Sequence, residues 1–221
     1  MGSQMIQIII LAAIALFLVL RLRSVLGTRD GFEKPPSVPA PAQTPRRDHS
    51  FEVIEGGGPD PDIADFIDAD SAAGKALAAM KKLDPNFSVH EFTHGARQAY
   101  EMIVMGYENG DLDLLRDLLA PEVYEPFAAA IEERRAKGYV VHADFVGVRE
   151  VTLADARFDP ATGEGDVTMR FLGELTSVVR DAEGAVVEGD PKEIKQQRDV
   201  WTFTRVMTSE NPNWLLTGTG G

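Results

Sequence analysis

The sequence predicts an α+β fold in which helices cover one face of an antiparallel sheet of roughly four strands. Two patterns along the 221-residue chain support this prediction. Apolar residues recur with helical spacing through residues 62–138, whereas from Tyr139 onward they alternate with polar residues, as half-buried strands do. A run of helices followed by a run of strands is typical of α+β domains, with the helices gathered on one side of the sheet.

The first element is an apolar run, and we expect residues 5–22 to form a single transmembrane helix that contacts membrane lipid. Up to Leu20 the run contains one polar residue, Gln7, and it is followed by Arg21 and Arg23. A spanning helix needs about 20 residues, and snorkelling of the two arginines can complete that length. A cleaved signal peptide is the alternative, but it would have a basic residue before the run and a small-residue cleavage site after it. The positive charges after the span predict a bacterial inner-membrane protein with its N-terminus outside and its C-terminal domain in the cytoplasm.

Residues 23–61 are predicted to be a flexible linker. Five prolines between Pro35 and Pro45 keep the segment extended, and three glycines, Gly56–Gly58, loosen its end. The segment has too little apolar surface to fold alone. The folded domain is therefore expected to be held near the membrane without lying on it.

Residues 62–83 are predicted to form a first helical segment, and residues 88–109 a long central helix. Ser88 and Glu91 have the spacing of a capping box, and the Asn109–Gly110 pair is a usual helix end. The helical period places one set of residues of the central helix on its apolar side. This set consists of Phe92, Ala96, Ala99, Tyr100, Ile103 and Tyr107.

The same helix contains the sequence His90-Glu91-Phe92-Thr93-His94, which fits the H-E-x-x-H pattern of zinc peptidases. That chemistry needs both histidines in a shielded cleft with a third ligand. Here they share the polar side of the helix with Arg97 and Glu101. A solvated helix face is therefore favoured, and we predict neither a metal site nor a cofactor.

Two shorter helices and four strands are expected to complete the domain. Asp111 can cap a helix that reaches Leu119, and Pro121 suits the first turn of a helix that reaches Gly138. The alternation is clearest after residue 166, where Val167, Met169, Phe171, Gly173 and Leu175 share a face. The expected strands are residues 145–158, 166–180, 196–207 and 214–219.

The charge of the chain limits the kinds of partner. The net charge is -13, and the residues after 48 carry -16 because the first 48 hold six Lys or Arg and three Asp or Glu. An acidic domain opposes binding to a nucleic-acid backbone, so we predict no nucleic-acid partner. The absence of cysteine fits a reducing compartment.

Several short motifs follow one another over about residues 70–219. They are Asp84-Pro85-x-Phe87, Phe92-x-x-Gly95-Ala96-x-x-Ala99, Asn109-Gly110-Asp111, Leu118-Leu119, Trp201-x-Phe203-x-Arg205 and Pro212-Asn213-Trp214-x-Leu216. Taken in order, these motifs resemble the Tim44-like domain family, and we assign residues 84–219 to that domain. The mitochondrial member of this family is a membrane-side tether that recruits the import chaperone, and the bacterial relatives with one membrane helix are described as adaptors. We expect neither the matrix presequence nor the long chaperone-binding region of the mitochondrial pattern here, so membrane-anchored binding is the role that the resemblance implies.

The resemblance implies a cone-shaped fold with an apolar pocket and a function without catalysis. We expect a membrane-anchored adaptor that binds a protein or a lipid-like ligand, linked to protein translocation or membrane-protein assembly. The alternative for the pocket residues is that they simply fill the core. The candidate lining residues are Phe127, Ile131, Phe171, Leu175, Trp201 and Phe203.

Three classes of function remain open from the sequence: an adaptor, a pocket enzyme and the zinc peptidase. Asp199 and Arg205 lie an even number of residues from Trp201 and Phe203 along the predicted strand. Side chains at such spacings share one face, so either charged side chain can reach the face of the two rings. A carboxylate inside an apolar pocket would favour a proton-transfer enzyme. Because strand ends are usually solvated, we favour the adaptor.

Overall fold

A computed structural model describes residues 58–220 of the chain. The predicted membrane span, residues 5–22, and most of the predicted linker, residues 23–61, lie outside the described residues. Within the described part, no helix has the length and apolar character needed to cross a membrane. The elements are α2 (Pro61–Ala64), α3 (Ala72–Leu83), α4 (Val89–Asn109), α5 (Leu112–Leu118), α6 (Pro121–Ala136), β1 (Val140–Asp159), β2 (Glu164–Arg180), β3 (Val186–Val206) and β4 (Leu215–Gly220).

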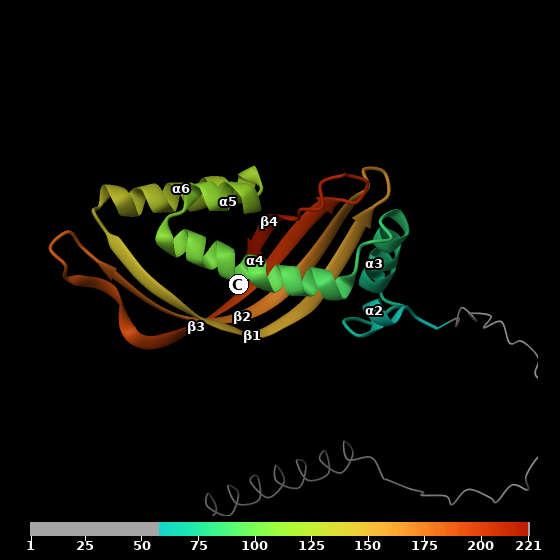
Figure 1. Cartoon of the computed structure of the whole chain (residues 1–221), viewed down its shortest axis with the longest axis horizontal. Coiled ribbons are helices and arrows are strands. Elements are labelled where there is room, and N and C mark those ends of the chain that lie inside the picture. The colour runs from blue at the N-terminus through green and yellow to red at the C-terminus, as the bar shows by residue number, and fades with distance from the viewer. Residues whose placement is uncertain (1–57, 221) are drawn as a thin grey trace, which may run out of the picture. The chain divides into compact units, whose positions relative to one another are not determined.

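The α+β prediction is confirmed, because helices precede a four-stranded antiparallel sheet in the order β1-β2-β3-β4. Figure 1 shows α4 crossing one face of the sheet, with α5 and α6 beside it and α2 and α3 near one end. The second half of β2 and the first half of β3, together with the start of β1, extend beyond α4 toward the C-terminal end of α6, and we call this part of the sheet the arm (Figure 1).

The central helix forms where its caps predict. The Ser88 hydroxyl accepts a 3.3 Å hydrogen bond from the Glu91 amide, and Gly110 ends α4 in the left-handed region with a φ of 70°. A residue with a side chain rarely adopts this φ, so glycine suits the helix end.

The predicted first helical segment, residues 62–83, contains two helices, α2 and α3, joined by residues 65–71. The Ser71 hydroxyl accepts a 3.0 Å hydrogen bond from the Gly74 amide and so starts α3 at Ala72. Gly74 also lies against the preceding loop, where an added Cβ would come 2.4 Å from the carbonyl oxygen of Asp68. This close approach folds the loop back onto the start of α3.

Two strands are longer than their patterns suggest. β1 begins at Val140 rather than at residue 145, and β3 begins at Val186 rather than at Gln196. The added residues belong to the arm, where most side chains of β3 are exposed, so no apolar alternation marks them. Register shifts in β1, after Phe145, Val148 and Leu153, also interrupt its alternation.

The core lies between the helices and the inner face of the sheet. The predicted alternation in β2 is correct: Val167, Met169, Phe171 and Leu175 are at most 4% exposed. The apolar side of α4 packs onto these strands, and Phe92, Ala96, Tyr100 and Ile103 are buried in the same cluster.

Candidate functional site

Tyr100 is buried on the inner face of the sheet and contacts Trp201 and Asp199, two residues that line the first cavity described below. Its ring stacks on Phe171 at 4.5 Å and lies 4.7 Å from Trp201. Its hydroxyl donates a 2.7 Å hydrogen bond to the carboxylate of Asp199. Gly173 of β2 makes room for the ring, because an added Cβ would lie 2.6 Å from the Tyr100 oxygen.

The first cavity, which we call the α6–β3 groove, has a volume of about 460 Å³. The C-terminal half of α4, the middle of α6, β3 and the end of β4 form its walls. Tyr107 and Phe127 meet edge to face at 5.1 Å, and both rings are half-buried. The lining residues are Ile103, Val104, Tyr107, Glu108, Pro126, Phe127, Ala130, Gln197, Asp199, Trp201, Thr219 and Gly220.

An adjoining hollow continues from the groove toward the arm. The two cavities share Tyr107, Glu108 and Gln197, and the hollow has a volume of about 510 Å³. Its other walls include Arg134, Leu175, Ser177 and the β3 segment 195–198. The groove and the hollow together form an elongated depression along β3. It is apolar near Trp201 and mixed toward the arm, where Tyr107, Leu175 and Val179 line it together with charged and amide side chains.

Asp199 brings a carboxylate to the groove. Its side chain accepts hydrogen bonds from the Tyr100 hydroxyl at 2.7 Å and from the Gln197 amide group at 3.2 Å. Burial, and then the hydrogen bond with Asp199, raise the pKa of Tyr100 above its ordinary value. The expectation of a solvated strand end does not apply to Asp199, because β3 begins at Val186 and the residue lies well inside the strand.

A second cavity, of about 450 Å³, lies between the first half of α4, the end of α5 and the loop before β4. Phe87, Phe92, Phe203 and Trp214 form an aromatic cluster in its wall, with the Phe92 and Trp214 ring centres 4.7 Å apart. Arg205 lies in the same wall.

The Arg205 guanidinium makes a partly buried ion pair with Asp84 at 2.7 Å. This bond holds the pKa of Asp84 below its usual range. The pair joins the loop between α3 and α4 to the end of β3. It thereby brings together two of the sequence motifs, one that begins at Asp84 and one that ends at Arg205.

The six predicted pocket residues are distributed over several surroundings. Phe127 and Trp201 line the α6–β3 groove, and Leu175 lines the adjoining hollow. Phe203 lines the second cavity. Ile131 and Phe171 pack in the core with 1% and 3% exposure.

Sequence reasoning missed several groove residues, above all Tyr107, Gln197 and Asp199. The helical period had placed Tyr107 on the apolar side of α4, which was a usable signal. The strand spacing placed Asp199 on the same face as Trp201. This spacing alone does not predict that its carboxylate accepts a hydrogen bond from the buried Tyr100 hydroxyl. Gln197 lies inside the predicted strand, residues 196–207, but its polar side chain gave no reason to place it in an apolar pocket.

The H-E-x-x-H sequence lies at the N-terminal end of α4 and faces outward. The His90 and Glu91 side chains are 72% and 80% exposed, with 3.7 Å between His90 Nδ1 and Glu91 Oε1. Among residues 58–220, no three His, Asp or Glu side chains are grouped so that they could hold a metal ion. The donor set of a zinc peptidase is therefore not assembled in the described part of the chain.

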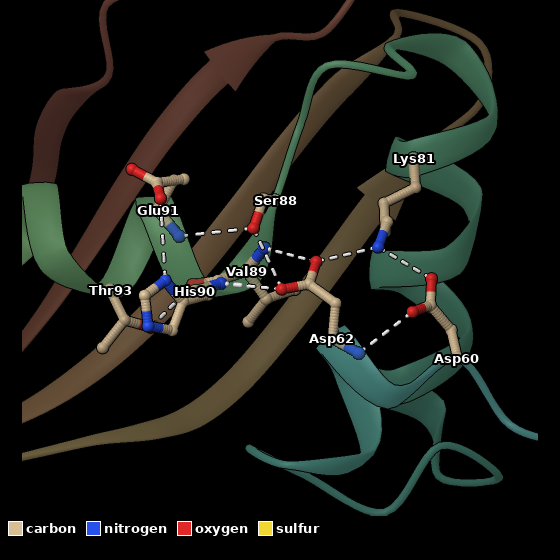
Figure 2. A network of polar contacts seen from close by, with 8 residues as sticks. All are labelled: Asp60, Asp62, Lys81, Ser88, Val89, His90, Glu91 and Thr93. Carbon is tan, nitrogen blue, oxygen red and sulfur yellow. Dashed lines mark hydrogen bonds and ion pairs between the residues drawn. The ribbon is translucent and has the colours of Figure 1, made fainter.

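The same helix end is held by a carboxylate from α2 (Figure 2). Asp62 accepts hydrogen bonds from the Val89 and His90 amides at 2.9 and 3.0 Å, and from the Ser88 hydroxyl at 2.9 Å. Lys81 donates a further bond at 2.8 Å. Burial alone would raise the pKa of Asp62, but these bonds together hold it well below its usual range.

The structure is an α+β domain with a groove between its helices and its sheet. The chain belongs to the Tim44-like domain family, whose model matches residues 73–221 and confirms the resemblance inferred from the motifs.

The curated relatives are subunits of a mitochondrial import inner membrane translocase. The mouse and human TIM44 subunits are 25% and 27% identical over 140 residues, which is 62% of this chain and 30% of each relative. TIM44-1 of Arabidopsis thaliana is 22% identical over 59% of this chain and 27% of the relative. The chain thus matches less than a third of the length of these relatives. Among solved structures, the intermembrane space region of the chloroplast protein ARC6 covers 58% of this chain and 94% of its own, with 9% identity and a TM-score of 0.41.

Proposed function

We propose that this protein is a membrane-anchored adaptor whose Tim44-like domain binds a protein partner in the α6–β3 groove. The observation that carries the proposal is the groove itself, an open cavity of about 460 Å³ with Trp201, Phe127 and Tyr107 in its walls. Concave apolar surfaces with a few placed polar groups are the usual binding sites of proteins. The relatives are named as translocase subunits, which supports a role connected with protein translocation.

Anchoring is part of the same proposal. The apolar run at residues 5–22 and the proline-rich linker would hold the domain close to the membrane surface on its cytoplasmic side. A cytoplasm-specific reporter fused after Gly221 should be active. Activity of a reporter that works only outside the cytoplasm would contradict this orientation.

Site-specific photocrosslinking of the full-length protein in cells tests the groove as the binding site. A photoreactive amino acid at Phe127 places the probe in the groove, whereas the same probe at Met102 lies on an exposed part of α4. The proposal predicts one protein captured from position 127 and not from position 102. Capture of lipid alone from position 127 would replace the protein partner by a lipid-like ligand. Capture of the same protein from both positions, or from neither, would contradict the proposal.

A proton-transfer enzyme is the second candidate, and one observation favours it: the Asp199 carboxylate lines the groove. Its two hydrogen bonds, from Tyr100 and Gln197, occupy acceptor positions that a general base would use for substrate. An Asp199→Asn variant keeps the shape of the side chain. If this variant captures the partner unchanged and cellular metabolite levels do not change, the result supports the adaptor. If capture is unchanged but a metabolite accumulates in cells that carry the variant, the result supports the enzyme.

A further inference from the structure

Strand β3 is much longer than the strand that covers its outer edge. β4 pairs only with Val200–Thr204, whereas β2 pairs with β3 through Lys195–Asp199 as well. In Figure 1, β3 continues into the arm beyond the end of β4. Within residues 58–220, no strand pairs with the outer edge of Lys195–Asp199. Such an edge presents backbone N–H and C=O groups to any extended chain that approaches it.

The distal part of this edge is protected, but the part beside the groove is not. Pro191 has no backbone N–H, Lys192 adds a charge, and the pairing with β2 is irregular between Asp190 and Lys195. Proteins use prolines, lysines and irregular pairing of this kind to prevent unwanted strand addition. The segment Lys195–Asp199 pairs regularly with β2 and contains no proline. The proline and the irregular pairing therefore stop where the groove begins.

The groove runs alongside this open edge. Gln197, Asp199 and Trp201 point to the helix side and line the groove, whereas the intervening Arg198 and Val200 are exposed. The adjoining hollow prolongs the groove past Lys195 and Gln196. An elongated depression beside a free strand edge matches an extended chain better than a compact ligand.

We propose that the groove binds its partner by strand addition. An extended polypeptide segment of a partner protein pairs with Lys195–Asp199 as a continuation of β4. It places every second side chain, apolar in character, into the groove. In this mode main-chain hydrogen bonds provide affinity, and the pockets select alternate side chains. Thr219 of β4 illustrates this arrangement, because it lies opposite Trp201 of β3 and both residues line the groove.

The occupant is a segment of another protein rather than a second copy of this chain. The residues after 48 carry a charge of -16, and a net charge of this size disfavours the association of two copies of this chain. This inference rests on the proposed adaptor function and specifies how the partner is held. Strand addition can be refuted while the adaptor function stands, because a partner can also bind the groove through side-chain contacts alone.

A strand tethered in cis tests whether the edge accepts a partner. β4 runs antiparallel to β3, with Gly220 opposite Val200, so residues added after Gly221 continue toward Lys195. In this register the second and fourth added residues lie opposite Gln197 and Lys195, so their side chains face the groove. One full-length variant carries valine at these two positions with threonine between them. The matched control carries the same residues shifted by one position, so that threonine faces the groove.

Amide hydrogen exchange is the readout. The in-register extension should slow exchange across Lys195–Asp199 by about tenfold or more and raise the melting temperature, whereas the shifted extension should not. Unchanged exchange in both variants would show that the edge does not accept a strand. Equal protection in both would show that the groove does not select side chains, and would overturn the proposal.

Selection from a displayed library of random ten-residue segments tests the class of partner. Segments that bind the full-length protein should have apolar residues at every second position, and should no longer bind the variant with the in-register extension. Enrichment of segments with helical spacing, or binding that the extension does not block, would overturn strand addition. Photocrosslinking from position 127 that persists in the extended variant would overturn it while leaving the adaptor function standing.

Discussion

The hydroxyl of Tyr100 donates a 2.7 Å hydrogen bond to the carboxylate of Asp199, and this bond joins the central helix to the floor of the groove. Tyr100 is fully buried and contacts the rings of Phe171 and Trp201. Asp199 lies on the stretch of β3 whose outer edge is open. The bond therefore fixes the position of α4 relative to the strand that we propose as the binding edge.

Removing the hydroxyl should destabilise the domain. We expect Tyr100→Phe to lower the free energy of unfolding by about 1.5–3 kcal/mol, because the bond is made to a carboxylate in a partly buried site. Urea unfolding at pH 7 measures the loss. Tyr124→Phe, which removes an exposed contact with Arg116, is the control and should cost less than about 1 kcal/mol. A Tyr100→Phe variant as stable as the control would contradict this account.

Tyr100 should also make stability depend on alkaline pH. Its pKa in the folded protein is raised, so its contribution is complete below the unfolded value of about 10 and is lost as pH rises toward the folded value. The wild type should therefore lose stability above about pH 10 more steeply than Tyr100→Phe. Unfolding curves at pH 8 and at alkaline pH compare the two slopes.

Asp62 should make stability depend on acid pH. Its pKa in the folded protein is lowered, so its contribution is complete above the unfolded value of about 3.9 and is lost as pH falls toward the folded value. Asp62→Asn should cost about 1–2 kcal/mol at pH 7, because it weakens the bonds to the start of α4 and leaves Lys81 without that partner.

The acid dependence separates this role from a general effect of charge. The difference between wild type and Asp62→Asn should shrink as pH falls below about 4. Asp65→Asn, an exposed change in the same segment, should leave stability within about 0.5 kcal/mol. A constant difference between wild type and Asp62→Asn down to pH 2 would show that the carboxylate charge does not hold the helix end.

Trp201 and Phe203 are both 3% exposed, so truncation of either should remove core packing. We expect Trp201→Ala and Phe203→Ala each to cost about 3–5 kcal/mol in chemical unfolding. Near-native stability with lost partner capture would instead mean that the ring serves binding alone. This expectation is why the binding tests use Phe127 and Ala130, which are only half-buried.

Two glycines should respond in opposite directions to the same change. Gly173→Ala places a Cβ 2.6 Å from the Tyr100 hydroxyl, so it should destabilise the domain by about 1–3 kcal/mol. Gly95→Ala lies within α4 with no atom within 4 Å of the new Cβ, and it should stabilise by up to about 1 kcal/mol. Melting curves of the two variants check the signs, and a stabilising Gly173→Ala would contradict the packing around Tyr100.

The sequence predicted those elements whose local signals agreed with their tertiary surroundings. The caps at Ser88 and Gly110 gave the bounds of α4, and the alternation from Val167 to Leu175 gave the inner face of β2. The parts of the arm that belong to β1 and β3 were missed because their side chains, such as Val187 and Ile194, are exposed and follow no period. Paired strands can be held by backbone hydrogen bonds alone, and these leave no mark in the composition.

The candidate site was predicted in part for a similar reason. Phe127 and Trp201 are large apolar residues with a clear face, and they line the groove. Ile131 and Phe171 are also large and apolar, but they pack in the core. The neighbouring elements, rather than the residue type, decide which side chains line a cavity. The open edge of β3 could not be predicted, since it depends on where β4 stops.

Filling the groove tests the central claim most directly. Ala130 lines the groove, whereas its neighbour Ala129 is exposed on the same helix, so Ala130→Trp and Ala129→Trp form a matched pair. The measurement is the amount of crosslinked partner captured by each full-length variant, at equal folded protein. The account predicts that Ala130→Trp loses most of the partner while Ala129→Trp retains it. Equal capture by the two variants would contradict binding in the groove.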